Sequence, residues 1–546
     1  MSKKQTEVVP RTTIRPQDEG GFFIGLALKK GRVNMAVKII LLVAFFAVTI
    51  AIGIYFRKRA STVSNFVLGG RNIGPWLTAF AYGTSYFSAV IFVGYAGQFG
   101  WDNGISAVWI GLGNAFIGSL AAWMILARRA RIMTKHFDSA TMPDFFEKRY
   151  DSKALKLAAA ILIFVFLIPY SASVYKGLAQ LFSSALGVSN LWVVLAMALF
   201  TAVYVVLGGY VASAANHLFQ GIIMLIGIVA VIASILGGKG GFTEAINQLS
   251  QISSDKAPEL QGAFVSFLGP NPLMLLSVVI LTSFGVWGLP QMVHKFYTIK
   301  SEKSIRAGTV ISTLFALIIG GGAYMLGGFG RLFYTPGTEG FSYNNIMPTM
   351  LVNNLSDLLV GVLLVLILCA SMSTLAALVL TSSSTVVLDF IKGTVKKDMN
   401  EKRQVSWIRI LCAVFIVISV VIALFPGTLI TTLMSLSWGA LAGAFLGPFL
   451  YGLFFKKATK ASVWASFVVG VGITVVNLFV PFINSPASSI VAGAIAIMSS
   501  FVVVPLVSLF TKKPDPKQVE WAFSCYDKQV ETTAESVLVD TEEPKA

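Results

Sequence analysis

Long apolar runs alternate with short polar connections along almost the whole chain. An α-helix needs about 20 mostly apolar residues to cross a bilayer, and runs of this length predict thirteen spans. They cover residues 36–56, 73–98, 104–128, 155–186, 190–207, 212–237, 271–292, 307–330, 355–390, 405–425, 427–454, 459–481 and 487–511. The pattern therefore predicts an all-α integral membrane protein.

Two polar segments flank this apolar body. Residues 1–35 form a polar N-terminal extension without an apolar run ahead of a cleavage site, so we expect no signal peptide. Residues 512–546 contain several Asp and Glu and are expected to form a solvated, partly disordered cytoplasmic tail. The sequence thus predicts one membrane domain over residues 36–511 between two polar ends.

Composition supports a membrane protein and argues against other classes. Of the 546 residues, 55% are hydrophobic and only 12% are charged, whereas soluble domains carry about 25% charged residues. The net charge is +17, but the basic residues lie between apolar runs, where they orient a membrane protein rather than bind nucleic acid. No HExxH or GxSxG motif occurs and the three cysteines lack metal-binding spacing. We expect neither enzymatic activity nor a cofactor.

Lysine and arginine gather in alternate connections between the predicted spans. The connections on the opposite side hold only Lys239, Lys256 and Arg331. Because positive loops stay on the cytoplasmic side, the C-terminus is predicted to be cytoplasmic and, with thirteen spans, the N-terminus to be outside. This is the topology of a multi-pass protein of the plasma membrane.

Two spans contain residues that weaken a helix. The middle of span 73–98 reads YGTSYFS over residues 82–88, and span 271–292 has Gly285, Gly288 and Pro290 near its end. Loosened helices free carbonyl groups that can face an ion or a solute, although small residues also serve ordinary helix packing. The spacing of the two segments fits a five-helix inverted repeat in which each half begins with a broken helix.

Span 355–390 is dense in hydroxyl groups. Ser371, Ser373 and Thr374 lie within one helical turn. Their oxygens are hard ligands that suit sodium, but hydroxyls in a helix also bond to the carbonyl one turn earlier. The residues alone leave both interpretations open.

Several stretches resemble the sodium/solute symporter family, and the similarity runs over about residues 36–511. They include LGGRNIGPWLTA at 68–79, TMPDFFEKRYDS at 141–152, VLGGYVASAANHLFQG at 206–221, GLPQMVHKFY at 288–297, CASMSTLAALVLTSSSTVVLDF at 369–390 and a stretch at 438–470. The resemblance implies a LeuT-type core of two inverted five-helix repeats, at roughly 73–237 and 271–454, with extra terminal helices. It also implies sodium-coupled uptake of a small polar organic solute by alternating access.

The resemblance also implies site residues. Sodium, the coupling ion, would be held by the carbonyls of Thr84, Phe87 and Ala370 and by the side-chain oxygens of Ser373 and Thr374. The solute would lie beside the first broken helix, where the candidates are Ser85, Tyr86, Tyr170, Lys176 and Trp287. A monomer is expected.

The chain departs from the family pattern at several positions. His217 stands where many members have an acidic residue, so we expect a single sodium ion per cycle. A histidine at this position leaves proton coupling as an alternative. Tyr86, Thr282 and Val286 replace an Asp, a Trp and a Tyr of the proline-transporting branch, so proline is not the expected substrate.

Lys176 lies well inside span 155–186 and has two interpretations. Its ammonium can extend along the helix to the nearer membrane surface, or it can pair with a carboxylate of the solute. No Asp or Glu lies deep in a core span to neutralise it, which favours a carboxylate-bearing solute. A non-transporting solute sensor is a further alternative, although about 35 residues after the last span are too few for a kinase domain.

Overall fold

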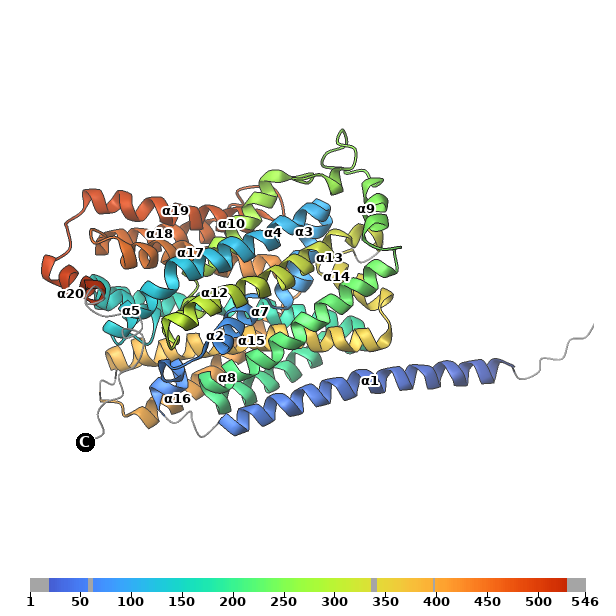
Figure 1. The fold of residues 1–546 in the computed structure, drawn as a ribbon, viewed down its shortest axis with the longest axis horizontal. Coiled ribbons are helices and arrows are strands. Elements are labelled where there is room, and N and C mark those ends of the chain that lie inside the picture. The colour runs from blue at the N-terminus through green and yellow to red at the C-terminus, as the bar shows by residue number, and fades with distance from the viewer. Residues whose placement is uncertain (1–18, 57–61, 335–340, 396–397, 528–546) are drawn as a thin grey trace, which may run out of the picture.

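The computed structural model describes residues 19–56, 62–334, 341–395 and 398–527, and nearly all of them are helical. The α-helices are α1 (Glu19–Phe56), α2 (Pro75–Tyr86), α3 (Ala96–Asn103), α4 (Val108–Gly113), α5 (Arg128–His136), α6 (Met142–Tyr150), α7 (Lys153–Leu186), α8 (Asn190–Gly237), α9 (Phe242–Ser250), α10 (Pro272–Gly288), α11 (Pro290–Tyr297), α12 (Glu302–Ala316), α13 (Gly322–Gly328), α14 (Tyr343–Asn354), α15 (Asp357–Thr385), α16 (Glu401–Leu424), α17 (Ile430–Phe454), α18 (Lys460–Phe479), α19 (Ser488–Phe510) and α20 (Pro516–Asp527). Most of the long helices run roughly parallel to one another in a single bundle (Figure 1). The predicted all-α membrane fold is confirmed.

The number of membrane spans differs from the prediction. Ten helices of the described residues are long and apolar enough to cross a membrane, or eleven if α10 and α11, which meet at 46°, form one span. By this measure the predicted spans 73–98 and 104–128 are not separate from each other. Residues Val90–His136 form one apolar segment, and α2, which precedes it, has only 12 residues. A third, at 190–207, corresponds to a shorter apolar helix over Asn190–Val205. The count of thirteen is therefore not confirmed.

Two predicted boundaries nevertheless coincide with interruptions of the backbone. Gly104, with φ +65°, lies inside the segment Val90–His136, and a Cβ there would lie 2.1 Å from the carbonyl oxygen of Phe264. Gly209, with φ +58° and ψ −161°, interrupts α8. Positive φ is readily available to glycine, so each position allows a change of direction within an apolar run.

The two broken helices lie where weak segments were predicted. Helix α2 ends at Tyr86, the chain is extended at Phe87, and a π-helical segment over Val90–Tyr95 continues into α3. Leu289, with ψ 122°, separates α10 from α11, and Pro290 begins α11. Proline lacks the N–H that a continuous helix would need at this point.

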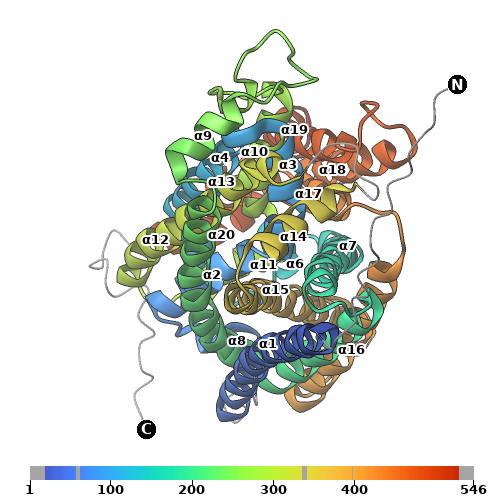
Figure 2. The same cartoon turned by 90° about the vertical axis from the view of Figure 1, so that its right-hand side faces the viewer.

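Helix α15 is the central helix of the bundle. It packs against α1, α2, α7, α8 and α16, and Figure 2, which looks along the bundle, shows it enclosed by its neighbours. Nearly all of its side chains are buried. A helix buried on all sides can place polar groups only where other helices supply partners, and this position brings its hydroxyl-rich middle against α2.

Both polar ends of the chain contain more helix than expected. Helix α1 begins at Glu19, within the predicted extension of residues 1–35, and projects beyond the bundle in Figure 1. At the other end, α20 packs on α5 and α6. The ring of Trp521 stacks on Phe137 at 5.0 Å, and Phe523 is buried. The expected solvated tail is thus wrong for the part over residues 516–527, because an apolar face of this helix has a partner surface.

Candidate functional site

Two hydroxyl groups of α15 meet the end of α2. The Oγ of Ser373 lies 2.9 Å from the carbonyl oxygen of Thr84 and 3.0 Å from that of Ala370. The Oγ1 of Thr374 lies 3.4 Å and 3.0 Å from the same two carbonyl oxygens. All four residues are buried. The structure therefore brings together four of the five predicted sodium ligands, from two helices nearly 300 positions apart in sequence.

The Thr84 carbonyl is available because α2 stops. The last carbonyls of a helix have no intrahelical donor, and α2 ends only two residues after Thr84. The hydroxyl of Thr84 donates back to Phe80 at 2.7 Å, so it does not compete for the carbonyl of its own residue. The C-terminal end of a helix also carries partial negative charge, which favours a cation.

The fifth predicted ligand, Phe87, lies at the break itself. Its amide donates to the carbonyl of Gly83 at 3.3 Å. Among the described residues, neither the Ser373 nor the Thr374 hydroxyl donates to the Phe87 carbonyl. The two interpretations of the hydroxyl groups both apply, because Ser373 also donates to Cys369 and Thr374 to Ala370, one turn earlier.

An aromatic group is formed by three side chains, Tyr86, which follows Thr84 by two residues on α2, together with Tyr170 and Trp438. The ring of Tyr86 lies 6.2 Å from that of Trp438, and the ring of Tyr170 meets Trp438 edge to face at 5.7 Å. The hydroxyl of Tyr86 donates to the Thr282 carbonyl at 2.6 Å, which joins α2 to α10. The hydroxyl of Ser85 is buried without a hydrogen-bond partner among the described residues. A buried polar atom in this state is costly unless a ligand engages it.

Trp438 links Tyr86 to Tyr170, and it was not among the predicted residues. It lies on α17, which packs against both α7 and α10. The sequence offers a tryptophan in a small-residue stretch, WGALAG, as the only local signal. Nothing in that stretch indicates which other helices the ring contacts.

Trp287 and Lys176 make their hydrogen bonds to other residues. The indole of Trp287 donates to the Ile117 carbonyl at 3.0 Å and contacts Phe284. The ammonium of Lys176 donates to the carbonyl of Phe425 at 2.7 Å. Phe425 directly follows the last residue of α16, so the ammonium reaches the end of a neighbouring span, as the surface-seeking interpretation expects.

His217 occupies the position where many family members have an acidic residue. Its ring is buried on α8, and neither nitrogen has a hydrogen-bond partner among the described residues. A protonated imidazole would need acceptors for two N–H groups. Histidine at this position supplies no carboxylate for a second cation.

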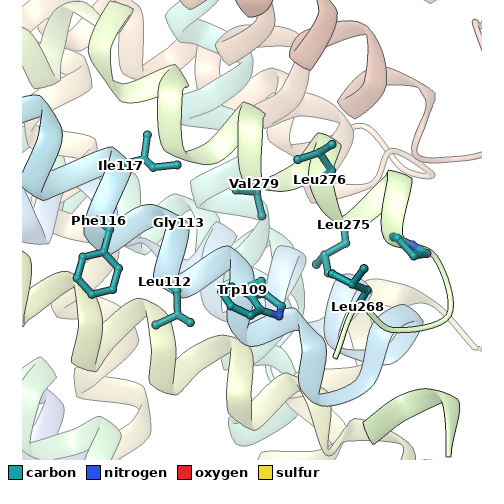
Figure 3. Close-up of a pocket in the computed structure, with 10 residues that line it drawn as sticks. Trp109, Leu112, Gly113, Phe116, Ile117, Leu268, Leu275, Leu276 and Val279 are labelled. Carbon is teal, nitrogen blue, oxygen red and sulfur yellow. The ribbon is translucent and has the colours of Figure 1, made fainter. Parts of the chain in front are cut away.

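An apolar cavity lies elsewhere (Figure 3). It has a volume of about 360 Å³ and lies between α10 and the segment that begins with α4. Its lining residues are Trp109, Leu112, Gly113, Phe116, Ile117, Leu268, Pro272, Leu275, Leu276 and Val279. Half of the Phe116 side chain is exposed on the outside of the bundle. None of the residues around the Ser373 oxygens lines this cavity, and its lining carries no charge for a polar solute.

Comparison with known structures supports the fold. An outward-open, substrate-bound Na+-coupled sialic acid symporter superposes with a TM-score of 0.72 at 16% sequence identity, over 88% of this chain and 99% of that chain. A nucleobase-cation-symport-1 family transporter in a closed conformation superposes with a TM-score of 0.50 at 15% identity, over 84% of this chain and 97% of that chain. At these identities the likeness shows the fold alone, and it confirms the LeuT-type arrangement.

Comparison of sequences gives the family. The chain is 29% identical over 499 residues to sodium/proline symporter 2 of Staphylococcus saprophyticus, covering 87% of this chain and 93% of that protein. It is 30% identical over 497 residues to the sodium/proline symporter of Staphylococcus aureus, with the same coverage. The model of the sodium:solute symporter family matches residues 66–470. The chain therefore belongs to the sodium:solute symporter family, and is a multi-pass membrane transporter that couples solute uptake to sodium rather than an enzyme.

Proposed function

We propose that this protein takes up a small carboxylate-bearing organic solute together with sodium by alternating access. The observation that carries the proposal is the convergence of the Ser373 and Thr374 hydroxyls on the Thr84 carbonyl at the end of a broken helix. We further propose a monomer in the plasma membrane, with residues 36–511 as its membrane domain.

The balance of donors and acceptors supports a cation at this point. Ser373 has one hydroxyl proton but three carbonyl oxygens within 3.0 Å, those of Thr84, Cys369 and Ala370. One proton can serve only one of them fully at a time. A sodium ion that takes the hydroxyl oxygens and two of the carbonyls as ligands would satisfy the surplus lone pairs. The Phe87 carbonyl is the proposed fifth ligand.

The proposed solute site lies one helical position further along α2. Ser85 and Tyr86 follow Thr84 directly, and Trp438 connects Tyr86 to Tyr170. Relatives named for proline and a structural neighbour named for sialic acid both handle solutes that carry a carboxylate. The unpartnered Ser85 hydroxyl can donate to such a group. Trp287 and Lys176 remain candidates that would have to move to reach the same solute.

We propose one sodium ion per cycle, because His217 offers no carboxylate at the second position. One charge moving through 100 mV supplies about 2.3 kcal/mol, and a tenfold sodium gradient supplies about 1.4 kcal/mol. Together they support roughly 500-fold accumulation of a neutral or zwitterionic solute. A single ion is therefore sufficient for uptake of a solute whose carboxylate is balanced by a positive group.

The positions of the two ends support a proposed orientation. The start of α1 and helix α20 lie at opposite ends of the bundle in Figure 1. The end with α20 carries the basic connections, so we propose that it faces the cytoplasm. Uptake would then begin at the end where α1 starts.

The test is a solute screen with the purified protein, followed by uptake in proteoliposomes. Thermal stabilisation by small acids, amino acids and sugars would be compared in sodium and in choline. We expect stabilisation by a carboxylate-bearing solute that requires sodium, and uptake that stops when choline replaces sodium. Uptake that persists in choline and follows a proton gradient would instead establish proton coupling, and a neutral sugar as the best ligand would contradict the carboxylate proposal.

A further inference from the structure

A basic cavity lies at the end of the bundle that carries α20. It has a volume of about 750 Å³ and lies where the end of α6, the start of α18 and the connection from α19 to α20 come together. Its basic lining residues are Arg149, Lys460, Lys512 and Lys513, and its acidic ones are Asp151 and Asp515. Positive charge is therefore in excess, and this site lies apart from the sodium and solute groups.

Arg149 is the buried charge of this cavity. It is only 1% exposed, and it donates to the carbonyls of Gly452 at 2.8 Å and Phe455 at 3.0 Å. Burial lowers the pKa of Arg149, but a guanidinium remains protonated in proteins. No carboxylate pairs with it in the part of the chain that the structure describes. These carbonyl groups accept from Nε and Nη2 without neutralising the charge, and Nη1 is buried without a hydrogen-bond partner among the described residues, so the field in the cavity stays positive.

The cavity lies where the exposed apolar surface of α19 ends. Lys460 is the first residue of α18, and Lys512 and Lys513 follow the end of α19 by two and three positions. Leu509 and Phe510, just before these lysines, are 73% and 83% exposed. Apolar surface that faces acyl chains thus ends directly beside cations, at the depth of lipid phosphate groups.

Helix α20 closes one side of the cavity. Pro516 and Gln518 belong to the lining, and the ring of Phe523 lies 5.0 Å from the Arg149 guanidinium. The ring of Tyr526 lies 4.7 Å from Arg129 on α5. Helix α20 therefore packs against Arg149 of the cavity and against Arg129, which lies outside the cavity lining.

We propose that this cavity binds the phosphate group of an anionic phospholipid. The phosphate would lie among Lys460, Lys512 and Lys513, with Arg149 behind it, and the acyl chains would extend along the exposed end of α19. Basic pockets between transmembrane helices on the cytoplasmic side bind such headgroups. Phosphate is the shared chemistry of a lipid headgroup and a free anion, so the experiment compares both sources.

The experiment measures the unfolding temperature of the full chain in detergent. Dioctanoyl phosphatidylglycerol, dioctanoyl phosphatidylcholine and inorganic phosphate are titrated into wild type and into the double variant Lys512→Gln/Lys513→Gln. The matched control is Lys402→Gln/Arg403→Gln, an exposed basic pair near the start of α16 that does not line the cavity. The lysines are exposed, so their replacement leaves the packing around Arg149 intact.

We expect saturable stabilisation by phosphatidylglycerol that phosphatidylcholine does not reproduce. Each lysine should account for about a fivefold change in affinity, so the double variant should bind roughly 25-fold more weakly, while the control binds like wild type. Equal saturable stabilisation by inorganic phosphate would keep the site but assign it to a free anion. Unchanged affinity in the double variant, or an equal effect of phosphatidylcholine, would overturn the proposal.

Discussion

Replacing Ser373 by alanine removes one oxygen from the proposed sodium site and adds no bulk. The Oγ of Ser373 is one of four oxygens that converge there, and it lies within 3.0 Å of three carbonyls. The alternative partners, Cys369 and Ala370, belong to the same helix, so α15 can remain intact without this hydroxyl. The expected defect is therefore in ion binding rather than in folding.

The magnitude follows from the type of interaction lost. An interaction between a neutral polar group and a charge contributes about 1.5–3 kcal/mol, which corresponds to a roughly 10- to 150-fold change in affinity. A water molecule that enters the vacated space would replace part of this contribution. We expect the sodium concentration for half-maximal uptake to rise about tenfold or more in Ser373→Ala.

Sodium-dependent uptake in proteoliposomes is the assay, with Ser419→Ala as the matched control. Ser419 is also a buried serine that donates to a carbonyl four residues earlier, at 2.8 Å, but it lies on α16. The control should keep the sodium dependence of wild type. If Ser373→Ala retained wild-type sodium dependence at comparable thermal stability, the assignment of this group of oxygens to sodium would be refuted.

Four further predictions concern the sodium stoichiometry, Lys176, Lys156 and Asp144. Uptake plotted against sodium should give a Hill coefficient near one, and a clearly sigmoidal curve would indicate a second ion. If Lys176 leaves Phe425 for a solute carboxylate, Lys176→Ala should weaken binding by about 1.5–3 kcal/mol and Lys176→Arg should rescue only in part; unchanged affinity would contradict the pairing. Lys156 lies 2.7 Å from Asp144 and 3.6 Å from the buried Asp389, so Lys156→Gln should lower stability by about 3–5 kcal/mol because it leaves a buried carboxylate without its cation. Burial alone would raise the pKa of Asp144, but Lys156 and Lys148 lower it below its ordinary value. The contribution of Asp144 to stability is therefore present at neutral pH and is lost as the pH falls through the lowered pKa. Thermal unfolding from pH 7 to pH 3 should show less acid sensitivity in Asp144→Asn.

Most of the fold could be predicted because it depends on local signals. Apolar length identifies helices, and glycine and proline mark their breaks, as at Phe87 and Leu289. The number of spans is harder, since Gly104 and Gly209 interrupt apolar runs without ending them. The docking of α20 was missed because its sequence is polar enough to resemble a solvated tail. Phe523 is buried, and Trp521 stacks on Phe137, because α5 and α6 provide a surface for this helix.

The candidate site also has features that the sequence predicts and features that it does not. The hydroxyl groups of α15 stand out in the sequence because few membrane helices are so dense in them. Their contact with Thr84 was implied by family resemblance and not by any local pattern. Trp438 was missed, since its role depends on the spatial meeting of α2, α7 and α17. A pattern within one segment carries no information on which distant segments it will contact.

The break in α2 gives a physical basis for coupling the ion to the solute. In a continuous helix the Thr84 carbonyl would accept a hydrogen bond from the amide of Ser88. Because α2 ends at Tyr86, the Thr84 carbonyl accepts from Ser373 and Thr374 of α15 instead. The same short segment carries Ser85 and Tyr86 into the proposed solute site. An ion that holds the Thr84 carbonyl against α15 therefore also fixes the two residues that would meet the solute, and a solute that orders these residues strengthens the ion site in return, as reciprocal coupling requires.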